Sequence, residues 1–313
     1  MRTIEVIEGG FFTTVQDLGR YGYQRYGVPV SGALDRFAIR AGNLLVGNQE
    51  SNAGLEITFV GPRLRFLCDS TIALAGANLG PTVNGKPVPV WESVAVSKGC
   101  VLSFQGPQDG IRSYLCVNGG IDVPQVLGSR STFIRSRLGG FEGRSLALGD
   151  MIPVADPAND AAKFIGRKLA SHSIPRYGND HTLRVIMGPQ DDAFTEAGIK
   201  TFLSSVYTVT PMFDRMGYRL AGPVIEHKAA ADIVSDGTPY GAVQVTGNGM
   251  PIVLLADCGT TGGYTKIATV ISVDLPLIGQ AQLGDTITFQ SIGLEEAHRA
   301  LREQEKLLET LRS

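Results

Sequence analysis

The residues best suited to chemistry follow a short apolar run late in the chain. Pro251 to Ala256 is apolar throughout and leads directly into Asp257-Cys258-Gly259-Thr260-Thr261-Gly262-Gly263-Tyr264-Thr265-Lys266. The glycines permit positive φ angles, so backbone N–H groups can converge there on a carboxylate or phosphate. Lys266 would add a positive charge to this anion-binding nest, and Asp257 would add an acid. The alternative is a tight glycine-rich hairpin in which Asp257 caps its own turn.

Arginines form the second group of candidates. Arg215 and Arg219 lie four residues apart, and on a strand they would share a face as an anion clamp. A solvated strand face is the alternative. Arg20 closes the segment Gln16-Asp17-Leu18-Gly19-Arg20, where Asp17 and Arg20 either hold the loop together as an ion pair or leave Arg20 to bind a carboxylate. Asn118 begins an Asn-Gly-Gly sequence that turn geometry alone explains.

Metal and cofactor signatures are missing. The four histidines and four cysteines lack ligand spacing, so no metal site is expected. Gly80 to Lys86 matches half of a phosphate-binding loop, but Pro87 stands where a Ser or Thr would bind magnesium, and a hairpin explains the segment better. There is no Met-Lys-Met sequence of the kind that carries biotin, so biotin is not expected to be attached to this chain.

The bulk composition is that of an ordinary globular protein. The 313 residues are 43% hydrophobic and 19% charged, with a formal net charge of −2. This balance argues against nucleic-acid or membrane partners. The first residues include Glu5 and Glu8 and no apolar core of a signal peptide, so we expect a cytoplasmic protein.

The elements that must position these side chains are mainly strands. Asn84-Gly85 and Gly247-Asn248-Gly249 stand between short apolar stretches, a pattern typical of hairpins. A barrel or sandwich is therefore favoured over a doubly wound sheet. Two helices stand out: one with Ser31 as its N-cap and an apolar face from Leu34 to Leu45, and one from Leu294 to the end of the chain.

The chain is long enough for two packed domains. Polar composition and weak periodicity after Ala155 mark the boundary between them. We expect a β-rich N-terminal domain over 1–165, a loose connection over 166–182, a C-terminal β-barrel domain over 183–293 and a helix over 294–313.

Several motifs together resemble the biotin-dependent carboxyltransferase family, in its allophanate hydrolase subunit 2-like branch. They run in order along nearly the whole chain: Thr13 to Arg20, Gly27 to Asp35, Leu44 to Asn48, Leu55 to Thr58, Asn118 to Pro124, Arg215 to Leu220 and Thr260 to Tyr264. The resemblance implies cyclophilin-like β-barrel architecture. It also implies a companion B subunit that shares the site.

The resemblance implies in addition that the B subunit and this chain act with a separate A subunit to open 5-oxoproline to L-glutamate at the expense of ATP, which would be held jointly with the B subunit. A carboxyltransferase resembling urea carboxylase, with its biotin carrier supplied in trans, is an alternative. Another is a non-catalytic partner of a kinase inhibitor homologous to the B subunit.

Opening a lactam requires cationic and N–H donors that face developing negative charge. The residues expected to act on the substrate are Arg20, Arg215, Arg219, Lys266 and Asp257. Those expected to bind substrate or its anionic groups are Gly259, Thr260, Thr261, Gly262, Gly263, Tyr264, Asp17 and Asn118.

Overall fold

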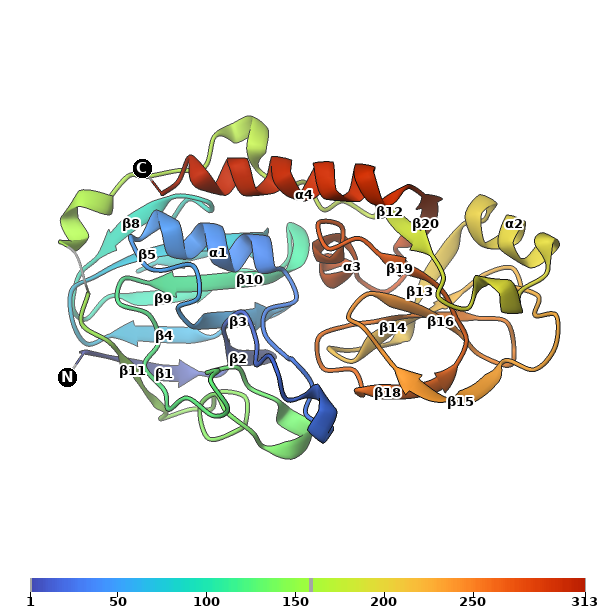
Figure 1. Cartoon of the computed structure of the whole chain (residues 1–313). Helices are drawn as coiled ribbons and strands as arrows, with labels where there is room; N and C mark the ends of the chain where they lie inside the picture. The colour runs from blue at the N-terminus through green and yellow to red at the C-terminus, as the bar shows by residue number, and fades with distance from the viewer. Residues whose placement is uncertain (1, 158–159, 313) are drawn as a thin grey trace. The chain divides into compact units, whose positions relative to one another are not determined.

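The computed structural model of the protein describes residues 2–157 and 160–312. These residues form two compact units, whose elements are drawn in Figure 1. Unit 1 contains the chain up to Tyr21, Ser31–Arg176 and the chain from Lys306 onward. Unit 2 contains Gly22–Val30 and Tyr177–Glu305. Each unit is therefore built from segments that are not contiguous in sequence.

Unit 1 contains two antiparallel sheets. The six-stranded sheet has the order β11 (Met151–Val154), β1 (Arg2–Glu8), β4 (Arg63–Phe66), β9 (Val101–Phe104), β6 (Pro81–Val83), β7 (Lys86–Pro87). The five-stranded sheet has the order β2 (Phe12–Gln16), β3 (Gly54–Thr58), β10 (Asp109–Val117), β5 (Ser70–Asn78), β8 (Ser93–Val96). Apolar side chains of both sheets, such as Ile4 and Leu64 from one and Leu55 and Leu115 from the other, form one buried cluster. Each fully buried aliphatic side chain stabilises such a core by about 1.5–3 kcal/mol.

Helix α1 (Arg36–Leu45) packs on the five-stranded sheet, where Phe37 joins a second apolar cluster with Trp91. The expected cap was wrong: the N-cap is Asp35, whose Oδ1 accepts a hydrogen bond of 2.8 Å from the Ala38 N–H. A capping side chain binds an N–H two or three residues further along the chain. Ser31 lies too far before the first residue of α1 to do this, and Asp35 is in the right place.

Unit 2 is built around a closed barrel, which confirms the expectation of a mainly β fold with a barrel and few helices. The seven strands follow the order β12 (Asp180–Met187), β19 (Lys266–Val270), β16 (Ala242–Val245), β17 (Pro251–Leu254), β14 (Gly217–Ala221), β13 (Tyr207–Phe213), β20 (Thr286–Ser291). Helices α2 (Glu196–Ser204) and α3 (Leu275–Gln280) complete the unit, and β15 (Asp232–Gly237) and β18 (Thr261–Tyr264) form a separate two-stranded sheet. Short 3₁₀ helices occupy Gln24–Tyr26, Ile134–Ser136, Ala161–Phe164, Ser171–Ser173 and Asp191–Ala193.

The expected C-terminal helix is α4 (Leu294–Glu309). Its residues up to Glu305 belong to unit 2, and those from Lys306 belong to unit 1. There Leu308 and Leu311 are buried in the cluster that contains Phe37 and Trp91. None of the helices that the structure describes has the length and apolarity needed to cross a membrane.

Candidate functional site

Three polar side chains lie in one row across neighbouring strands of the barrel. Arg219 of β14 is paired with Ile252 of β17, which is paired with Gln244 of β16, which in turn is paired with Lys266 of β19. Residues opposite each other in antiparallel strands project from the same face of a sheet. We call Arg219, Gln244 and Lys266 the polar row.

Strands β15 and β18, which we call the flap, cover part of the polar row. Asp236 of β15 lies with its Oδ2 3.1 Å from Lys266 Nζ. Gly262 of β18 approaches Gln244 so closely that a Cβ on this glycine would lie 2.5 Å from Gln244 Nε2. Lys266 is 1% exposed and Gln244 6% exposed, while Arg219 is exposed. The flap therefore buries the amine and the amide and leaves the guanidinium in solvent.

The Lys266 ammonium pairs with Asp236, and Gln190 binds both this carboxylate and the Lys266 backbone. A buried charge is costly unless it is paired and hydrogen-bonded, and Asp236 is the carboxylate that pairs with it. Gln190 Nε2 donates to the same Asp236 oxygen over 3.3 Å, and Gln190 Oε1 accepts from the Lys266 N–H over 3.0 Å. The hydrogen bond from Lys266, assisted by the N–H of Gly237, lowers the pKa of Asp236. The Asp236 carboxylate is thus ionised at neutral pH.

Gln244 carries a donor that none of the described residues satisfies. Its Nε2 is buried and makes no hydrogen bond with any of them. Leaving a buried donor unpaired costs about 1–3 kcal/mol, and such an exception calls for an explanation. A ligand acceptor beneath the flap would supply the missing partner.

The expected glycine nest was wrong. Gly259, Gly262 and Gly263 do not have positive φ angles, and the last two lie within strand β18. The sequence from Thr261 to Tyr264 pairs with β15 instead of folding back as a hairpin on β17. Gly262 serves close packing, because only a residue without a Cβ fits against the Gln244 amide.

The connection between β17 and β18 holds the remaining candidates of this stretch. Gly259 and Thr260 accept hydrogen bonds at their carbonyl oxygens, from the Thr238 hydroxyl and from the Thr238 N–H respectively. Tyr264, at the end of β18, is 37% exposed. The N–H groups of this stretch therefore do not form the cup that the sequence suggested.

Arg215 and Arg219 do not share the face of one strand, which corrects the expected clamp. Strand β14 begins only at Gly217, and Arg215 lies before it, buried against Asp257. The Arg215 Nε and NH2 atoms lie 2.9 and 3.2 Å from the two Asp257 carboxylate oxygens. This bidentate pair neutralises Asp257, so Arg219 alone of the two arginines is exposed on the barrel face.

The predicted site residues from the first part of the chain lie in unit 1, where hydrogen bonds connect their side chains to neighbouring loops. Asp17 accepts hydrogen bonds from the hydroxyls of Ser129 and Ser131 and from the N–H of Arg130 over 2.6 Å. Arg20, fully buried, donates to the carbonyl oxygen of Ser131 over 2.6 Å. Both side chains therefore have structural bonds that fasten the loop around Ser131 to the end of β2.

Asn118 likewise has a structural position. Its Nδ2 donates to the carbonyl oxygen of Val46 over 2.5 Å, and its N–H donates to the carbonyl oxygen of Thr71 over 2.9 Å. The first bond satisfies a carbonyl just beyond the end of α1, where helices leave such groups unpaired. Asn118 thereby joins α1 to the end of β10.

His227 is a residue of interest that sequence reasoning considered only as a metal ligand. Its ring contacts Phe194 in a tilted arrangement, with 4.5 Å between centroids and 35° between the ring planes. Its Nε2 lies 3.1 Å from the hydroxyl of Thr265, the residue before Lys266. Burial lowers the pKa of His227, which favours the neutral imidazole. Within residues 2–157 and 160–312, no cluster of three or more His, Cys, Asp or Glu side chains is arranged to hold a metal ion.

No local signal in the sequence pointed to Gln190 or Asp236. Asp236 precedes Gly237, which by pattern indicates a turn, and Gln190 lies in a Gly-Pro-Gln-Asp segment that also occurs at Gly106. Both reach Lys266 only through folding, over sequence separations of 76 and 30 residues. Only knowledge of the strand pairing would have identified them.

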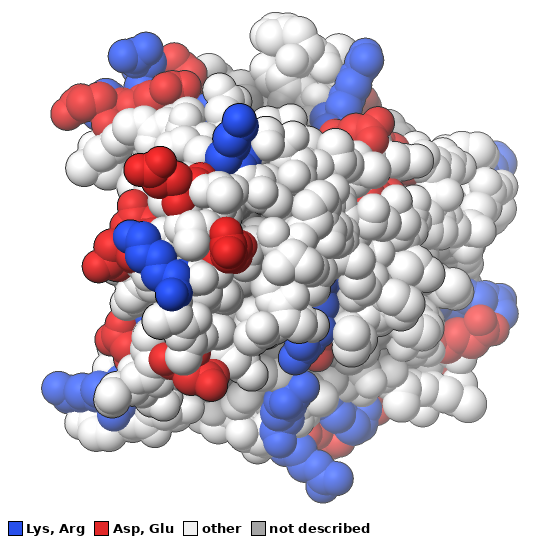
Figure 2. All heavy atoms as spheres, turned by 90° about the vertical axis from the view of Figure 1, so that its right-hand side faces the viewer, with Lys and Arg blue, Asp and Glu red and all other residues white. Residues whose placement is uncertain are grey.

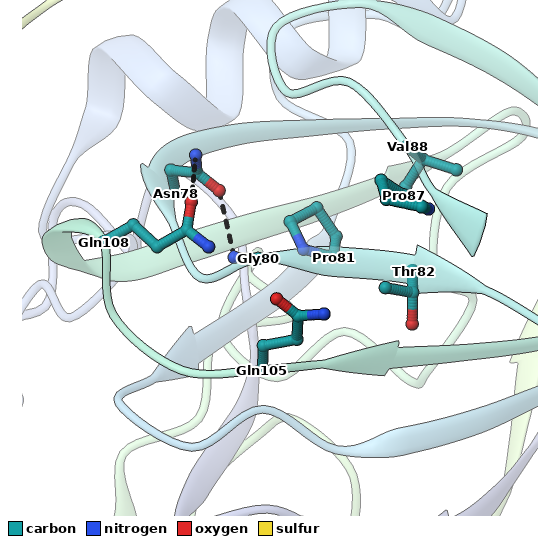
Figure 3. Close-up of a pocket in the computed structure, with 8 residues that line it drawn as sticks. All are labelled: Asn78, Gly80, Pro81, Thr82, Pro87, Val88, Gln105 and Gln108. Carbon is teal, nitrogen blue, oxygen red and sulfur yellow. Dashed lines mark hydrogen bonds between the residues drawn. The ribbon is translucent and has the colours of Figure 1, made fainter. Parts of the chain in front are cut away.

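A small pocket lies in unit 1, beside the start of β6 (Figure 3). Its volume is about 190 Å³, and its lining is Asn78, Gly80, Pro81, Thr82, Pro87, Val88, Gln105 and Gln108. Asn78 donates to Gln108 Oε1 over 2.9 Å and accepts from the Gly80 N–H over 2.9 Å. Two of the three lining amides thus bond to each other, and no lining residue is ionisable.

The same region contains the segment that partly matches a phosphate-binding loop. Strands β6 and β7 pair as a hairpin, with Asn84 and Gly85 at positive φ of 51° and 78° in the turn. Positive φ at both central residues is the signature of a two-residue hairpin turn. The hairpin expected for this segment is therefore confirmed.

Charged side chains of both signs are interspersed on the face drawn in Figure 2. Lysines, arginines and acids stand among wide uncharged areas there, consistent with a formal net charge of −2 for the whole chain. Such a surface favours local ion pairs over long-range steering of a highly charged partner.

Comparisons with known proteins agree along nearly the whole chain. A family model described as carboxyltransferase domain, subdomain A and B, matches residues 26–291. The Escherichia coli protein named as the C subunit of 5-oxoprolinase is 38% identical over 308 residues, which cover 98% of this chain and 97% of that protein. The Haemophilus influenzae protein of the same name is 36% identical over 309 residues, with 99% and 97% covered.

A solved structure shares the fold. The crystal structure of the Kluyveromyces lactis urea amidolyase superposes on 99% of this chain with a TM-score of 0.93 and 33% identity. This chain spans only 20% of the length of that protein.

Proposed function

Because the chain belongs to the family of carboxyltransferase domains with subdomains A and B, we propose that it is the C-type subunit of an ATP-dependent 5-oxoprolinase. In this proposal it acts with a B-like subunit, bound directly, and an A-like subunit to convert 5-oxoproline to L-glutamate. The observation that supports it most strongly is the match to two proteins of that name over 97% of their length.

The polar row supplies the donors that this substrate needs. 5-Oxoproline carries a carboxylate and a lactam carbonyl, both of which accept hydrogen bonds. Lys266 offers a buried charge, Gln244 an unpaired N–H donor and Arg219 an exposed guanidinium. Donors fixed in place before the reaction stabilise charge that develops on an oxygen at little reorganisation cost. The proposed role of this chain is to bind and orient the substrate.

ATP would supply the driving force for opening the lactam. The residues described here fit a shared nucleotide site better than a complete one, because the Gly80 to Lys86 segment is a hairpin and does not present the N–H groups of a phosphate loop. Lys266 and Arg219 are the cations on the barrel face that suit a phosphate. We therefore assign the rest of the nucleotide site to the B-like subunit.

The first experiment measures glutamate formed from 5-oxoproline and ATP by this chain mixed with its cognate A-like and B-like subunits. Each component is omitted in turn. We expect glutamate only when all three are present. If leaving out this chain makes no difference, the proposed function is wrong.

The second experiment tests the site. Lys266→Met keeps the length of the side chain and removes its charge, and we expect glutamate formation to fall by about a hundredfold. Lys200→Met is the matched control, because Lys200 is exposed on α2 and should leave the activity unchanged. Size-exclusion chromatography must find both variants in the complex. Full activity in Lys266→Met would remove the polar row from the mechanism.

The similarity to urea amidolyase supports a second candidate, transfer of a carboxyl group from carboxybiotin. The observation that favours this candidate is the TM-score of 0.93 over 99% of this chain. Biotin would then be attached to a separate carrier. If this candidate is right, the chain supplied with a carboxylated biotin carrier should transfer the carboxyl group to an acceptor, and avidin should abolish the transfer. If 5-oxoprolinase is right, avidin should leave glutamate formation unchanged.

A further inference from the structure

We propose that Lys266, Gln244 and Gln190 form a carboxylate-binding subsite, and that Asp236 of the flap occupies it as an internal competitor until a ligand carboxylate displaces it. This inference rests on the proposed function for the location of the site. It adds the chemical class of the ligand group and a mechanism of access.

The donor set matches a carboxylate. Lys266 Nζ and Gln190 Nε2 both point at one oxygen of Asp236, over 3.1 and 3.3 Å. Gln244 Nε2, beneath the same flap, is a donor without a partner among the described residues. An ammonium and two amide N–H donors suit an acceptor-only group with two oxygens. Asp236 satisfies two of these donors. Gln244 pairs with Lys266 in the barrel, and Gly262, which covers the Gln244 amide, pairs with Asp236 in the flap, so a ligand carboxylate beneath the flap would lie beside all three donors.

The two partners of the ion pair differ in exposure, and this favours displacement. The Lys266 side chain is 1% exposed, whereas the Asp236 side chain is 56% exposed. Water can solvate the exposed Asp236 carboxylate when it leaves, so its departure costs that side chain little. Lys266 stays buried and requires a new anion, because a buried charge is costly unless it is paired.

The flap has the architecture of a movable element. It consists of only two strands, β15 and β18, which pair with each other and with no strand of the barrel. A two-stranded sheet alone is marginally stable in water. Val234 on β15 is 93% exposed, so its outer face lacks the apolar packing that would fix it. The Asp236–Lys266 bond thus acts as a latch on this sheet.

The test compares Asp236→Asn with the unaltered chain in its complex with the B-like subunit. The variant keeps the size of the side chain and removes the competing charge. If the latch is closed about nine-tenths of the time, the apparent affinity for 5-oxoproline should rise about tenfold. Calorimetry measures this affinity, with the neutral 5-oxoproline amide as the matched ligand. Asp232→Asn is the matched control, because Asp232 is an exposed acid on the same strand.

We expect Asp236→Asn to gain affinity for 5-oxoproline but not for its amide, and Asp232→Asn to gain neither. The double variant Lys266→Met with Asp236→Asn should not show this increase in affinity for 5-oxoproline. Equal or weaker carboxylate binding by a folded Asp236→Asn variant would contradict the inference.

A chemical measurement keeps the inference testable where calorimetry detects no binding. Amine acetylation, followed by mass spectrometry, should modify Lys266 faster in Asp236→Asn than in the unaltered chain, and 5-oxoproline or acetate should protect it. An unchanged rate would overturn the latch. If acetate protects Lys266 but no glutamate forms, the carboxylate subsite is supported and the proposed function is wrong. If glutamate forms but Asp236→Asn has no effect, the proposed function is supported and the inference about Asp236 is wrong.

Discussion

The Arg215–Asp257 ion pair joins the turn before β14 to the end of β17. Both side chains are 8% exposed, so removing one charge leaves the other buried. We expect Asp257→Asn to lower the free energy of unfolding by about 3–5 kcal/mol, measured by urea denaturation. Arg215→Met combined with Asp257→Leu should recover much of this loss, because no buried charge remains. A fully stable but inactive Asp257→Asn chain would instead restore a catalytic role for Asp257.

His227 gives stability a pH dependence of defined sign. Burial lowers the pKa of His227 in the folded protein, so as the pH falls the unfolded chain, with a pKa near 6.5, takes up the proton first. The contribution of neutral His227 to the free energy of unfolding is complete above the pKa of the unfolded chain. It is lost as the pH falls through that value. We expect His227→Gln to reduce the dependence of the unfolding free energy on pH between about pH 7.5 and 5.5. An unchanged dependence would mean that other groups control it.

At the residue scale, the sequence indicated which side chains carry charge but not how they pair. Lys266 and Arg219 were recognised as candidate cations, and the structure places both on the barrel face. The carboxylate that neutralises Arg215 lies 42 residues away, and the one that meets Lys266 lies 30 residues away. Such pairings depend on strand register, which no local pattern encodes.

The flap is the element on which access to the polar row depends. The two glycines of β18 offer a matched test. A Cβ on Gly262 would meet Gln244 Nε2 at 2.5 Å, whereas a Cβ on Gly263 would meet nothing closer than 3.6 Å. We expect Gly262→Ala to displace the amide or lift the flap and to lower kcat/KM by about tenfold to a hundredfold. The kcat/KM of Gly263→Ala should stay near that of the unaltered chain.

Hydrogen exchange gives the structural readout for this pair of variants. The amides of β15 and β18 should exchange faster in Gly262→Ala than in Gly263→Ala, because the displaced flap opens more often. Equal exchange and equal activity in the two variants would show that the close approach of Gly262 has no functional role.

At the element scale, hairpin patterns predicted the mainly β fold and left a barrel or a sandwich open, the family resemblance implied the barrel, and an apolar stripe predicted the terminal helix. The glycine-rich stretch could not be predicted in the same way. Glycine is favoured both where φ is positive and where two chains approach closely, and the sequence does not distinguish these causes. Gly262 belongs to the second class, which is why a stretch expected to be a nest folds as strand β18.

At the scale of the whole molecule, each unit is built from segments that alternate along the chain. Gly22–Val30 belongs to unit 2, although the chain on both sides of it belongs to unit 1, and the end of the chain returns to unit 1 at Lys306. We expect a chain cut at an engineered protease site after Arg176, which is exposed, to elute as one species on size exclusion under native conditions. Urea should then release two fragments. Separation without denaturant would mean that the exchanged segments contribute little.

The exchanged segments also limit how genes of this family can be rearranged. A single crossover, or the transfer of one contiguous stretch, cannot replace unit 2 alone, because Gly22–Val30 is encoded far from Tyr177–Glu305. A hybrid made in this way would combine a barrel from one parent with an inserted segment from the other. Both units should therefore be inherited as one cassette. In the Kluyveromyces lactis urea amidolyase the matching region likewise takes in 99% of this chain, as expected for a module that recombination moves only as a whole.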